Sequence, residues 1–342
     1  MKQLINIILV LAIFLILGGC SEDDSTESSV SNTGEIEHIE ILSVYEDESL
    51  YSVSETCELE NNKLIYVVAN TDSNKSEIFI RDKESDSQTE QILSTDLWQV
   101  RNLVCAPSGD SFAVAVGDEV RLYGGGTNTS YMSDTIIGVE HLIYTHDGEK
   151  LIAVSSDHTA YIYNTLSLLL IKSFDTTIGY TSQKNVLGVS GDDAKMVLLG
   201  GYENEKLVVI DLNSSLVTEV TTPALSGTFS QAFYENNSKL VVGSGYGDGH
   251  IYIVDLNNTT EIERYDIGLE NYIYDMKIID EHYLLAGGYD HDFVLYDLAT
   301  HSVVAQKSLA PINNIEVLLN GDIVVSTGAG RGGGIYTLKV TP

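Results

Sequence analysis

The stretch "GGYDHDFVLYD", residues 287–297, places two carboxylates and an imidazole in consecutive positions, Asp290, His291 and Asp292. Carboxylate and imidazole are a plausible ligand set for a transition metal. A similar pair, Asp248 and His250, occurs in "GDGH". However, adjacent residues in a tight turn rarely converge on one ion, and Asp and Gly are typical turn residues because they tolerate left-handed backbone. The stretch therefore predicts a turn between two strands, with no metal site and no cofactor.

Other patterns of catalytic residues are missing from the sequence. No nucleophile elbow, Gly-rich phosphate loop or His-Glu-x-x-His helix occurs in it. The formal net charge of −32 disfavours binding to nucleic acid or to anionic membrane surfaces, because both repel an acidic protein. A partner that is steered by charge should be basic.

A repeat organises the chain from about residue 35 to residue 340. Short apolar runs such as "KLIYVVAN" and "KLVVGSGY" recur, and each is followed by a turn and a second strand-like segment. The runs begin at Leu64, Phe112, Leu151, Met196, Leu240, Leu284 and Ile323. Their spacing is typical of a β-propeller with four strands in each blade. We therefore predict an all-β, seven-bladed propeller over residues 35–342.

Two of the repeats, "KLVVGSGYGDGHIYIVDLNN" and "YLLAGGYDHDFVLYDLATHS", resemble WD-repeat blades. Val254-Asp255 and Tyr296-Asp297 occupy the positions of that family's Trp-Asp pair. The resemblance implies a closed ring that serves as a platform for protein partners.

The two ends of the repeat region fit a closed ring. The last blade is one strand short at the C-terminus, whereas residues 35–44 have spare alternating apolar positions at Ile36, Ile39 and Ile41. We expect this N-terminal segment to complete the last blade as its outer strand, which protects a sheet edge from aggregation.

Tyrosine follows glycine directly after the apolar run in three consecutive blades, at Tyr202, Tyr246 and Tyr289. The turn needs only Asn, Asp or Gly, so these tyrosines predict a binding surface, with Tyr246 in its middle blade. Further aromatic residues precede innermost strands on the same face: Tyr51, Trp98, Tyr180, Phe229 and Tyr272. Carboxylates edge the predicted surface: Glu203, Glu205, Asp248, Asp290 and Asp292. The alternative is that the rings pack between blades.

The N-terminus has the pattern of an exported protein. One basic residue, Lys2, precedes an uncharged apolar run from Leu4 to Leu17, which is the size of a signal-peptide core. The following "LGGC" resembles the lipobox of bacterial lipoproteins, and the resemblance implies cleavage before Cys20 and its lipidation. An ordinary signal peptide with a chance cysteine is the alternative. Residues 1–19 are thus expected to be a signal peptide and residues 20–34 an acidic, flexible tether.

Cys57 and Cys105 each lie seven residues before the start of their apolar run, at Leu64 and Phe112. This spacing places both on innermost strands of adjacent blades, in a compartment where a disulfide persists. Equivalent side chains would point in parallel from strands that can stand more than about 7 Å apart, so the repeat geometry disfavours a bridge.

Together these patterns predict a monomeric, lipid-anchored envelope protein, with the outer membrane favoured, that binds a protein or a glycan without catalysis. A lactonase-like hydrolase is the alternative, because some such enzymes are also seven-bladed propellers.

Overall fold

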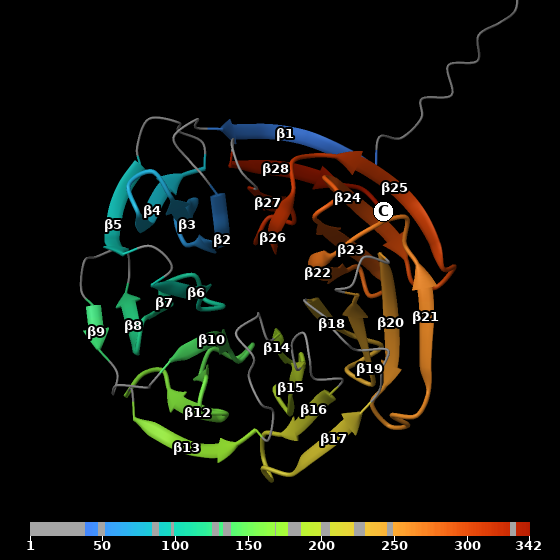
Figure 1. Ribbon diagram of the computed structural model, residues 1–342, viewed down its shortest axis with the longest axis horizontal. Helices are drawn as coiled ribbons and strands as arrows, with labels where there is room; N and C mark the ends of the chain where they lie inside the picture. The colour runs from blue at the N-terminus through green and yellow to red at the C-terminus, as the bar shows by residue number, and fades with distance from the viewer. Residues whose placement is uncertain are drawn as a thin grey trace, which may run out of the picture. The chain divides into compact units, whose positions relative to one another are not determined.

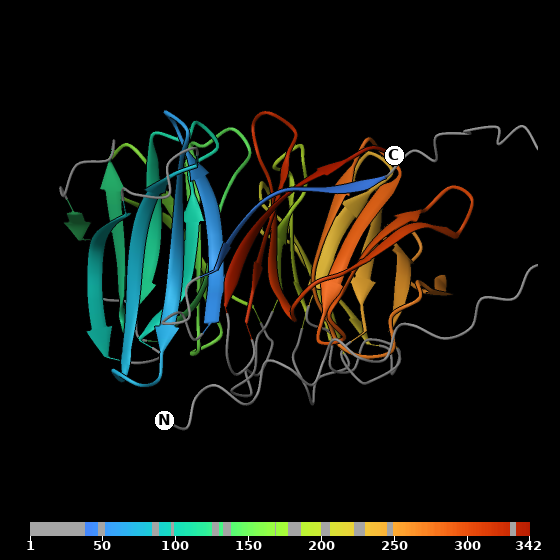
Figure 2. The same ribbon diagram turned by 90° about the horizontal axis from the view of Figure 1, so that it is seen from above.

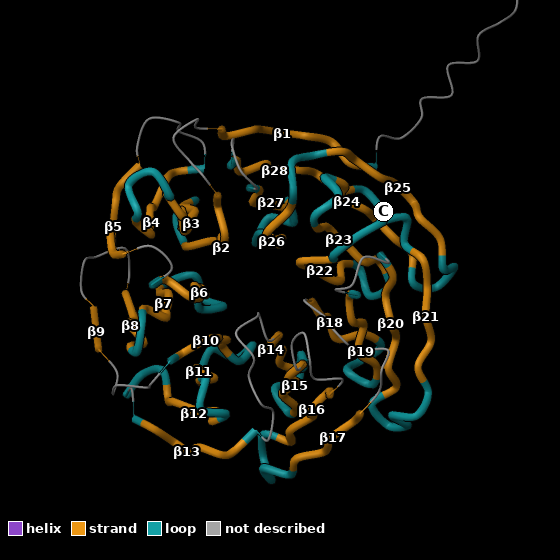
Figure 3. The backbone as a smooth tube through the Cα atoms, viewed as in Figure 1, coloured by secondary structure: helices purple, strands orange, loops and turns teal. Residues whose placement is uncertain are grey.

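The computed structural model describes residues 38–46, 52–83, 89–96, 99–124, 130–132, 138–167, 169–176, 186–199, 206–221, 230–244, 249–328 and 333–342. These residues all belong to one compact unit, Glu37–Pro342. They form strands and loops without any helix (Figure 3). Within these ranges there is accordingly no helix that could cross a membrane. The expected signal peptide and tether, residues 1–34, lie outside the described residues.

The strands of the first four blades have the following bounds: β2 Ser52–Leu59, β3 Lys63–Asn70, β4 Lys75–Asp82, β5 Thr89–Asp96; β6 Val100–Cys105, β7 Ser111–Val116, β8 Glu119–Gly124, β9 Ser130–Met132; β10 Val139–Tyr144, β11 Lys150–Ser155, β12 Thr159–Asn164, β13 Leu170–Asp175; β14 Val186–Val189, β15 Lys195–Leu199, β16 Lys206–Asp211, β17 Val217–Thr221. Those of the last three blades are β18 Ser230–Tyr234, β19 Lys239–Gly243, β20 His250–Asp255, β21 Ile262–Asp266; β22 Ile273–Ile279, β23 Tyr283–Gly288, β24 Asp292–Asp297, β25 Ser302–Ser308; and β26 Ile312–Val317, β27 Ile323–Thr327, β28 Gly334–Val340 with β1 Ile39–Glu46.

These strands form seven four-stranded antiparallel sheets, which are the blades of a ring (Figure 1). The first strand of each blade is innermost and lies beside the innermost strand of the next blade, and β26 lies beside β2. The prediction of a seven-bladed β-propeller is confirmed.

The ring has two faces, because antiparallel strands place successive turns at opposite ends (Figure 2). We call front the face with the turns between second and third strands and the connections between blades. The back face carries the turns between first and second strands and between third and fourth strands.

The N-terminal strand closes the ring as expected, although its bounds differ from the predicted ones. Strand β1 begins at Ile39 rather than at residue 35 and pairs antiparallel with β28, from Ile39 opposite Val340 to Glu46 opposite Gly334. Ile39 and Ile41 pack into the apolar cluster between the sixth and last blades. Ile36 lies outside the described residues. The strand begins on the back face, which is also where β28 ends.

The predicted apolar runs are the second strands of the blades, and they are apolar throughout because both sides of each sheet are covered. In β3, Leu64 and Tyr66 pack toward the last blade, whereas Ile65 and Val67 pack toward the second blade. Among the described residues there are seven such apolar clusters, one at each boundary between neighbouring blades. No blade therefore has a buried core of its own, and stability depends on complete closure of the ring.

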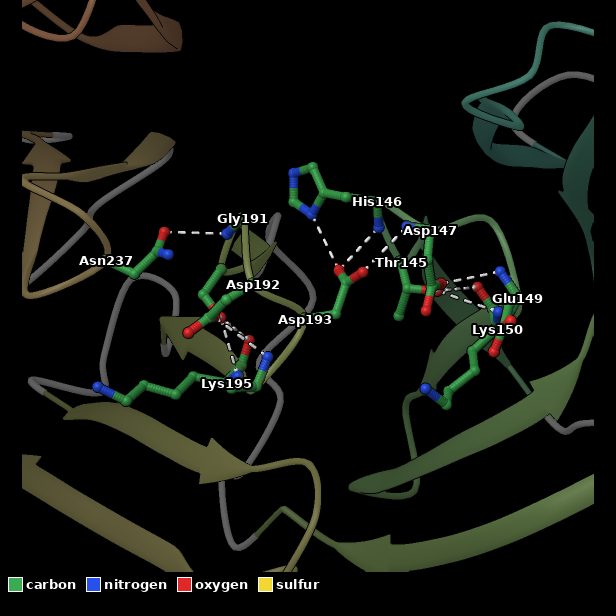
Figure 4. A network of polar contacts seen from close by, with 12 residues as sticks. Thr145, His146, Asp147, Glu149, Lys150, Gly191, Asp192, Asp193, Lys195 and Asn237 are labelled. Carbon is green, nitrogen blue, oxygen red and sulfur yellow. Dashed lines mark hydrogen bonds and ion pairs between the residues drawn. The ribbon is translucent and has the colours of Figure 1, made fainter.

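Polar contacts join neighbouring blades on the back face (Figure 4). The Asp193 carboxylate of the fourth blade accepts backbone N–H bonds from His146 and Asp147 of the third blade, at 2.7 and 2.9 Å, and lies 3.0 Å from Nδ1 of His146. The Gly191 N–H donates to Oδ1 of Asn237 in the fifth blade at 2.9 Å. The turns between the first and second strands of these three blades thus hold neighbouring blades together.

Candidate functional site

Three tyrosines gather at the front-face end of the sixth blade. The rings of Tyr272 and Tyr274 are stacked, with centroids 6.0 Å apart and planes 13° apart. The Tyr289 ring meets the Tyr272 ring edge-on, with centroids 6.3 Å apart and planes at 82°. Tyr289 is 49% exposed, and the other two tyrosines are half-buried. We call these three residues the tyrosine cluster.

Backbone contacts position the cluster. The Tyr289 N–H donates to the carbonyl of Tyr272 at 3.1 Å, so the turn after β23 is tied to the segment that precedes β22. A Cβ atom on Gly288 would lie 1.7 Å from that same carbonyl oxygen, which excludes any side chain there. Asp290 adds a second tie, because its Oδ2 accepts the Glu270 N–H at 2.7 Å. The glycine of the Gly-Tyr pair is therefore required by the close approach of two backbones.

The third member, Tyr274, occupies an irregular position in the innermost strand. The register of β22 against β23 shifts between Ile273 and Asp275, so Tyr274 is the extra residue of a β-bulge. Burial raises the pKa of Tyr274, and the negative charge of Asp290 adds to the effect. Its phenol thus stays neutral, and able to donate a hydrogen bond, to a higher pH than an ordinary tyrosine does.

The structure gathers Tyr272, Tyr289 and Asp290, which were predicted together from the sequence. Asp292, another predicted member, begins β24. The predicted arc over three blades remains a prediction, because its other members lie outside the described residues. These are Tyr202, Tyr246, Trp98, Tyr180 and Asp248, together with Tyr51, Phe229, Glu203 and Glu205. Tyr274 was missed, although its spacing of two residues from Tyr272 was a signal that could have found it, because side chains two apart in an extended segment lie on the same side.

The trio Asp290, His291 and Asp292 forms a turn, as expected. His291 has a positive φ of 68°, which is typical of a left-handed turn residue. Asp292 begins β24 and its Oδ2 accepts a bond from Gln306 at 2.9 Å, away from the Asp290 contact with Glu270. In the described parts of the chain, no three His, Cys, Asp or Glu residues are placed to hold a metal ion.

A polar network joins the innermost strands of the sixth, last and first blades. The Asp275 carboxylate accepts the Ile315 N–H at 2.7 Å and a bond from the Asn314 amide at 3.2 Å. Oδ1 of Asn314 in turn accepts the backbone N–H and the hydroxyl of Thr56, at 3.1 and 2.7 Å. This network ties the last blade to the first one at the point where the ring closes.

A second group of charged residues lies two positions further along two of these innermost strands, β22 and β26. Nζ of Lys277 in β22 is 4.0 Å from Oε2 of Glu316 in β26. Burial raises the pKa of Glu316 from its ordinary value of 4.5 to about 7, with Lys277 opposing the shift and Asp275 and Glu58 adding to it. The pKa of Lys277 is raised, chiefly by Asp275. Hence Glu316 is the titrating group of this cluster near pH 7.

This raised pKa predicts how stability depends on pH. Between about pH 4.5 and pH 7 the folded protein holds a proton on Glu316 that the unfolded chain releases, so this group lowers the free energy of unfolding as pH rises through that range. Glu316→Gln removes the effect. We expect urea unfolding to show the variant gaining stability relative to wild type from pH 4.5 to 7, with a constant difference above pH 7. Glu90→Gln, at an exposed position of an outer strand, is the control; a Glu316→Gln difference that does not change with pH would refute the assignment.

Cys57 and Cys105 form a disulfide between the first two blades, with Cα atoms 5.8 Å apart. The expectation that the geometry disfavours a bridge is wrong. Cys105 lies opposite Phe112, the start of its apolar run, but Cys57 lies opposite Ile65, one residue beyond the start of its own run. A shift of one residue turns a strand side chain to the other side of the sheet, so the two cysteines face each other instead of pointing in parallel.

The fold defines the class of this protein as a seven-bladed β-propeller. No protein-family model matches the chain, and no curated protein matches its sequence. The WD-repeat and lipobox resemblances therefore depend on the sequence motifs alone.

Proposed function

We propose that this protein is a non-enzymatic binding platform, of the WD-repeat type, that holds a protein partner on its front face. The tyrosine cluster carries this proposal. Tyr289 offers an exposed ring that meets the Tyr272 ring, and its backbone is held by the bond to Tyr272 and by the neighbouring Asp290 contact with Glu270. A tyrosine held in this way contributes a large contact area at little entropic cost.

Charge supports a basic partner. The formal net charge of the chain is −32, and Asp290 lies directly beside the cluster. A Lys or Arg side chain of the partner would be attracted by the overall field, by the Asp290 carboxylate and by the faces of the tyrosine rings. We propose that the partner is a protein of the same envelope with a basic binding segment; a glycan is the alternative ligand.

The binding proposal is tested by Tyr289→Ala. Loss of a central aromatic anchor should weaken partner binding by about 2 kcal/mol, roughly 30-fold in Kd, with little change in the melting temperature because the side chain is half exposed. The partner is first recovered by a pull-down with the intact protein, and its affinity is then measured by calorimetry.

The matched control is Tyr265→Ala, which removes a tyrosine that stacks on His301 away from the cluster, with ring centroids 3.9 Å apart. We expect it to leave partner affinity unchanged. Early unfolding of the Tyr289 variant with unchanged affinity would show that the ring only packs. Recovery of no partner, with turnover of lactones or glycans by the pure protein, would favour the hydrolase instead.

We also propose that lipidated Cys20 anchors the protein in a bacterial envelope, at the outer membrane. The support is the apolar run from Leu4 to Leu17 followed by "LGGC" and an acidic segment. Cys20→Ser should move the protein from the membrane fraction to the soluble fraction of fractionated cells, in amounts measured by immunoblotting. Lipid anchoring would be refuted if the variant still sediments with membranes and Cys20 of the wild-type protein carries no acyl group by mass spectrometry.

A further inference from the structure

Exposed aliphatic side chains cluster on the back-face rim of the third and fourth blades. They come from the turn between β12 and β13, from the start of β13 and from the turn between β16 and β17. The group, which we call the leucine patch, consists of Leu166, Leu169, Leu170, Ile171 and Leu216. Their exposed fractions run from 46% for Leu170 to 95% for Leu166. This is unusual on a protein that carries so much charge, because monomeric proteins rarely leave apolar side chains grouped on the surface.

The two parts of the patch are held side by side. Nζ of Lys172, next to Ile171, donates to Oγ of Ser215 at 3.1 Å and to the carbonyl of Leu212. Ser215 immediately precedes Leu216. The Lys172 ammonium is thus turned toward the neighbouring blade, and Leu170, Ile171 and Leu216 beside this contact remain exposed.

The fold does not demand these leucines. The turn at Leu166 is fixed by Asn164, whose Oδ1 accepts the Ser167 N–H at 2.9 Å. Asp211, Asp255 and Asp297 fix the equivalent turns of three other blades in the same way. The residue that corresponds to Leu166 is Asn213, Asn257 or Ala299 in those turns. A polar or small residue is therefore sufficient for the turn, and Leu166 needs another explanation.

The composition of the patch fits lipid better than protein. Binding hot spots in protein interfaces are enriched in Trp, Tyr and Arg, and leucine is under-represented among them. The patch contains none of the enriched residue types, and its most exposed member projects from the end of a turn. An apolar side chain at such a site needs only an apolar medium, which the boundary between headgroups and acyl chains provides.

The position of the patch also favours contact with a lipid surface. The turns of Leu166 and Leu216 lie on the back face, where β1 begins. His38, just before β1, accepts the Thr341 N–H on its carbonyl at 2.9 Å, so the chain joins the ring at this face. The 37 residues before His38 include the apolar run from Leu4 to Leu17. A chain from Cys20 to His38 can extend about 60 Å at roughly 3.4 Å per residue, which is enough to let the back face reach a membrane.

We propose that the leucine patch inserts into a zwitterionic lipid surface and holds the propeller with its back face toward the membrane. The net charge of −32 selects against an anionic surface. The inserted side chains add an attachment point that is separate from Cys20, and they turn the tyrosine cluster away from the bilayer. The proposal goes beyond the binding function and does not require the lipid on Cys20.

The test uses the chain from residue 20 onward with Cys20→Ser, so that the apolar run from Leu4 to Leu17 cannot bind vesicles; in it Cys57 and Cys105 are bonded, and an added cysteine is the one that reacts. Leu166→Cys carries an environment-sensitive fluorophore, and Asp72→Cys, on an exposed front-face turn, is the matched control. Both are mixed with phosphatidylcholine vesicles that contain a spin-labelled phosphatidylcholine. We expect a blue shift and quenching of the label at residue 166 and neither change at residue 72.

A second variant tests affinity in the same unlipidated chain. The double variant Leu166→Asn with Leu216→Asn should raise the dissociation constant for vesicles at least about tenfold, because the transfer of two leucine side chains from water into lipid is lost. Equal behaviour of the labels at residues 166 and 72 on vesicle-bound protein would overturn the proposal. A blue shift at residue 166 that depends on protein concentration without vesicles would also overturn it, since a second copy would then cover the patch.

Discussion

Reduction of the disulfide between Cys57 and Cys105 is expected to lower the free energy of unfolding by about 4 kcal/mol, from the loop entropy of a separation of 48 residues. The bond joins the first two blades, and Cys57 is buried in the apolar cluster between them. Without the bond, the unfolded chain regains the freedom of the whole segment between the cysteines. Urea unfolding of the same protein with and without a reductant measures the difference.

The control is the double variant Cys57→Ala with Cys105→Ala. Its stability should match that of the reduced protein, apart from the small effect of the two lost sulfur atoms. The reductant should not change it. Thiol counting in denaturant, on the Cys20→Ser chain, gives an independent check. Two reactive thiols before reduction would contradict the bond, and zero would agree with it.

Loss of Asn314 should have the second large effect, about 3 kcal/mol for Asn314→Ala. Asn314→Ala leaves the Thr56 N–H without its partner in a residue that is 3% exposed, and an unsatisfied buried group costs about 1–3 kcal/mol. It also removes the amide donor to Asp275. Asn314→Asp keeps the acceptor for Thr56 but places a second negative charge beside Asp275.

The matched control for this prediction is Asn320→Ala, in an exposed turn of the same blade, where the amide contacts only Asp322. Its effect should stay below about 0.5 kcal/mol, as for most surface substitutions. Urea unfolding followed by circular dichroism compares the variants. Equal losses for Asn314→Ala and Asn320→Ala would mean that the network between innermost strands does not stabilise the closed ring.

The sequence predicts the architecture well because the same physical demand recurs in every blade. A second strand covered on both sides must be apolar at every position, so runs such as that of β3 stand out at a regular spacing. The spare strand β1 was found for a similar reason, because Ile39 and Ile41 had no partner within the first blade. Its first residue was misplaced, since alternation alone does not say where pairing with β28 starts.

The details of the site depend on backbone features that the apolar pattern does not reveal. The bulge at Tyr274 recurs near the start of the innermost strand in four other blades, yet in the sequence it looks like any other strand position. The cysteines were misjudged because equal sequence spacing was taken as equal register, although the turn before Leu64 is shorter than the one before Phe112. One residue of register decides which side of a sheet a side chain occupies, and turn length sets that register.

The pairing of β1 with β28 has a consequence for how the protein is made. During synthesis the strand that closes the ring emerges first, and its partner emerges last. A chain that is truncated anywhere before Gly334 therefore cannot complete its last blade and keeps unpaired strand edges, which chaperones and proteases recognise. Under the export that we propose, this order postpones ring closure until translocation is complete. The contacts that close the ring are also the most distant in sequence, so we expect closure to be a late and slow step of folding.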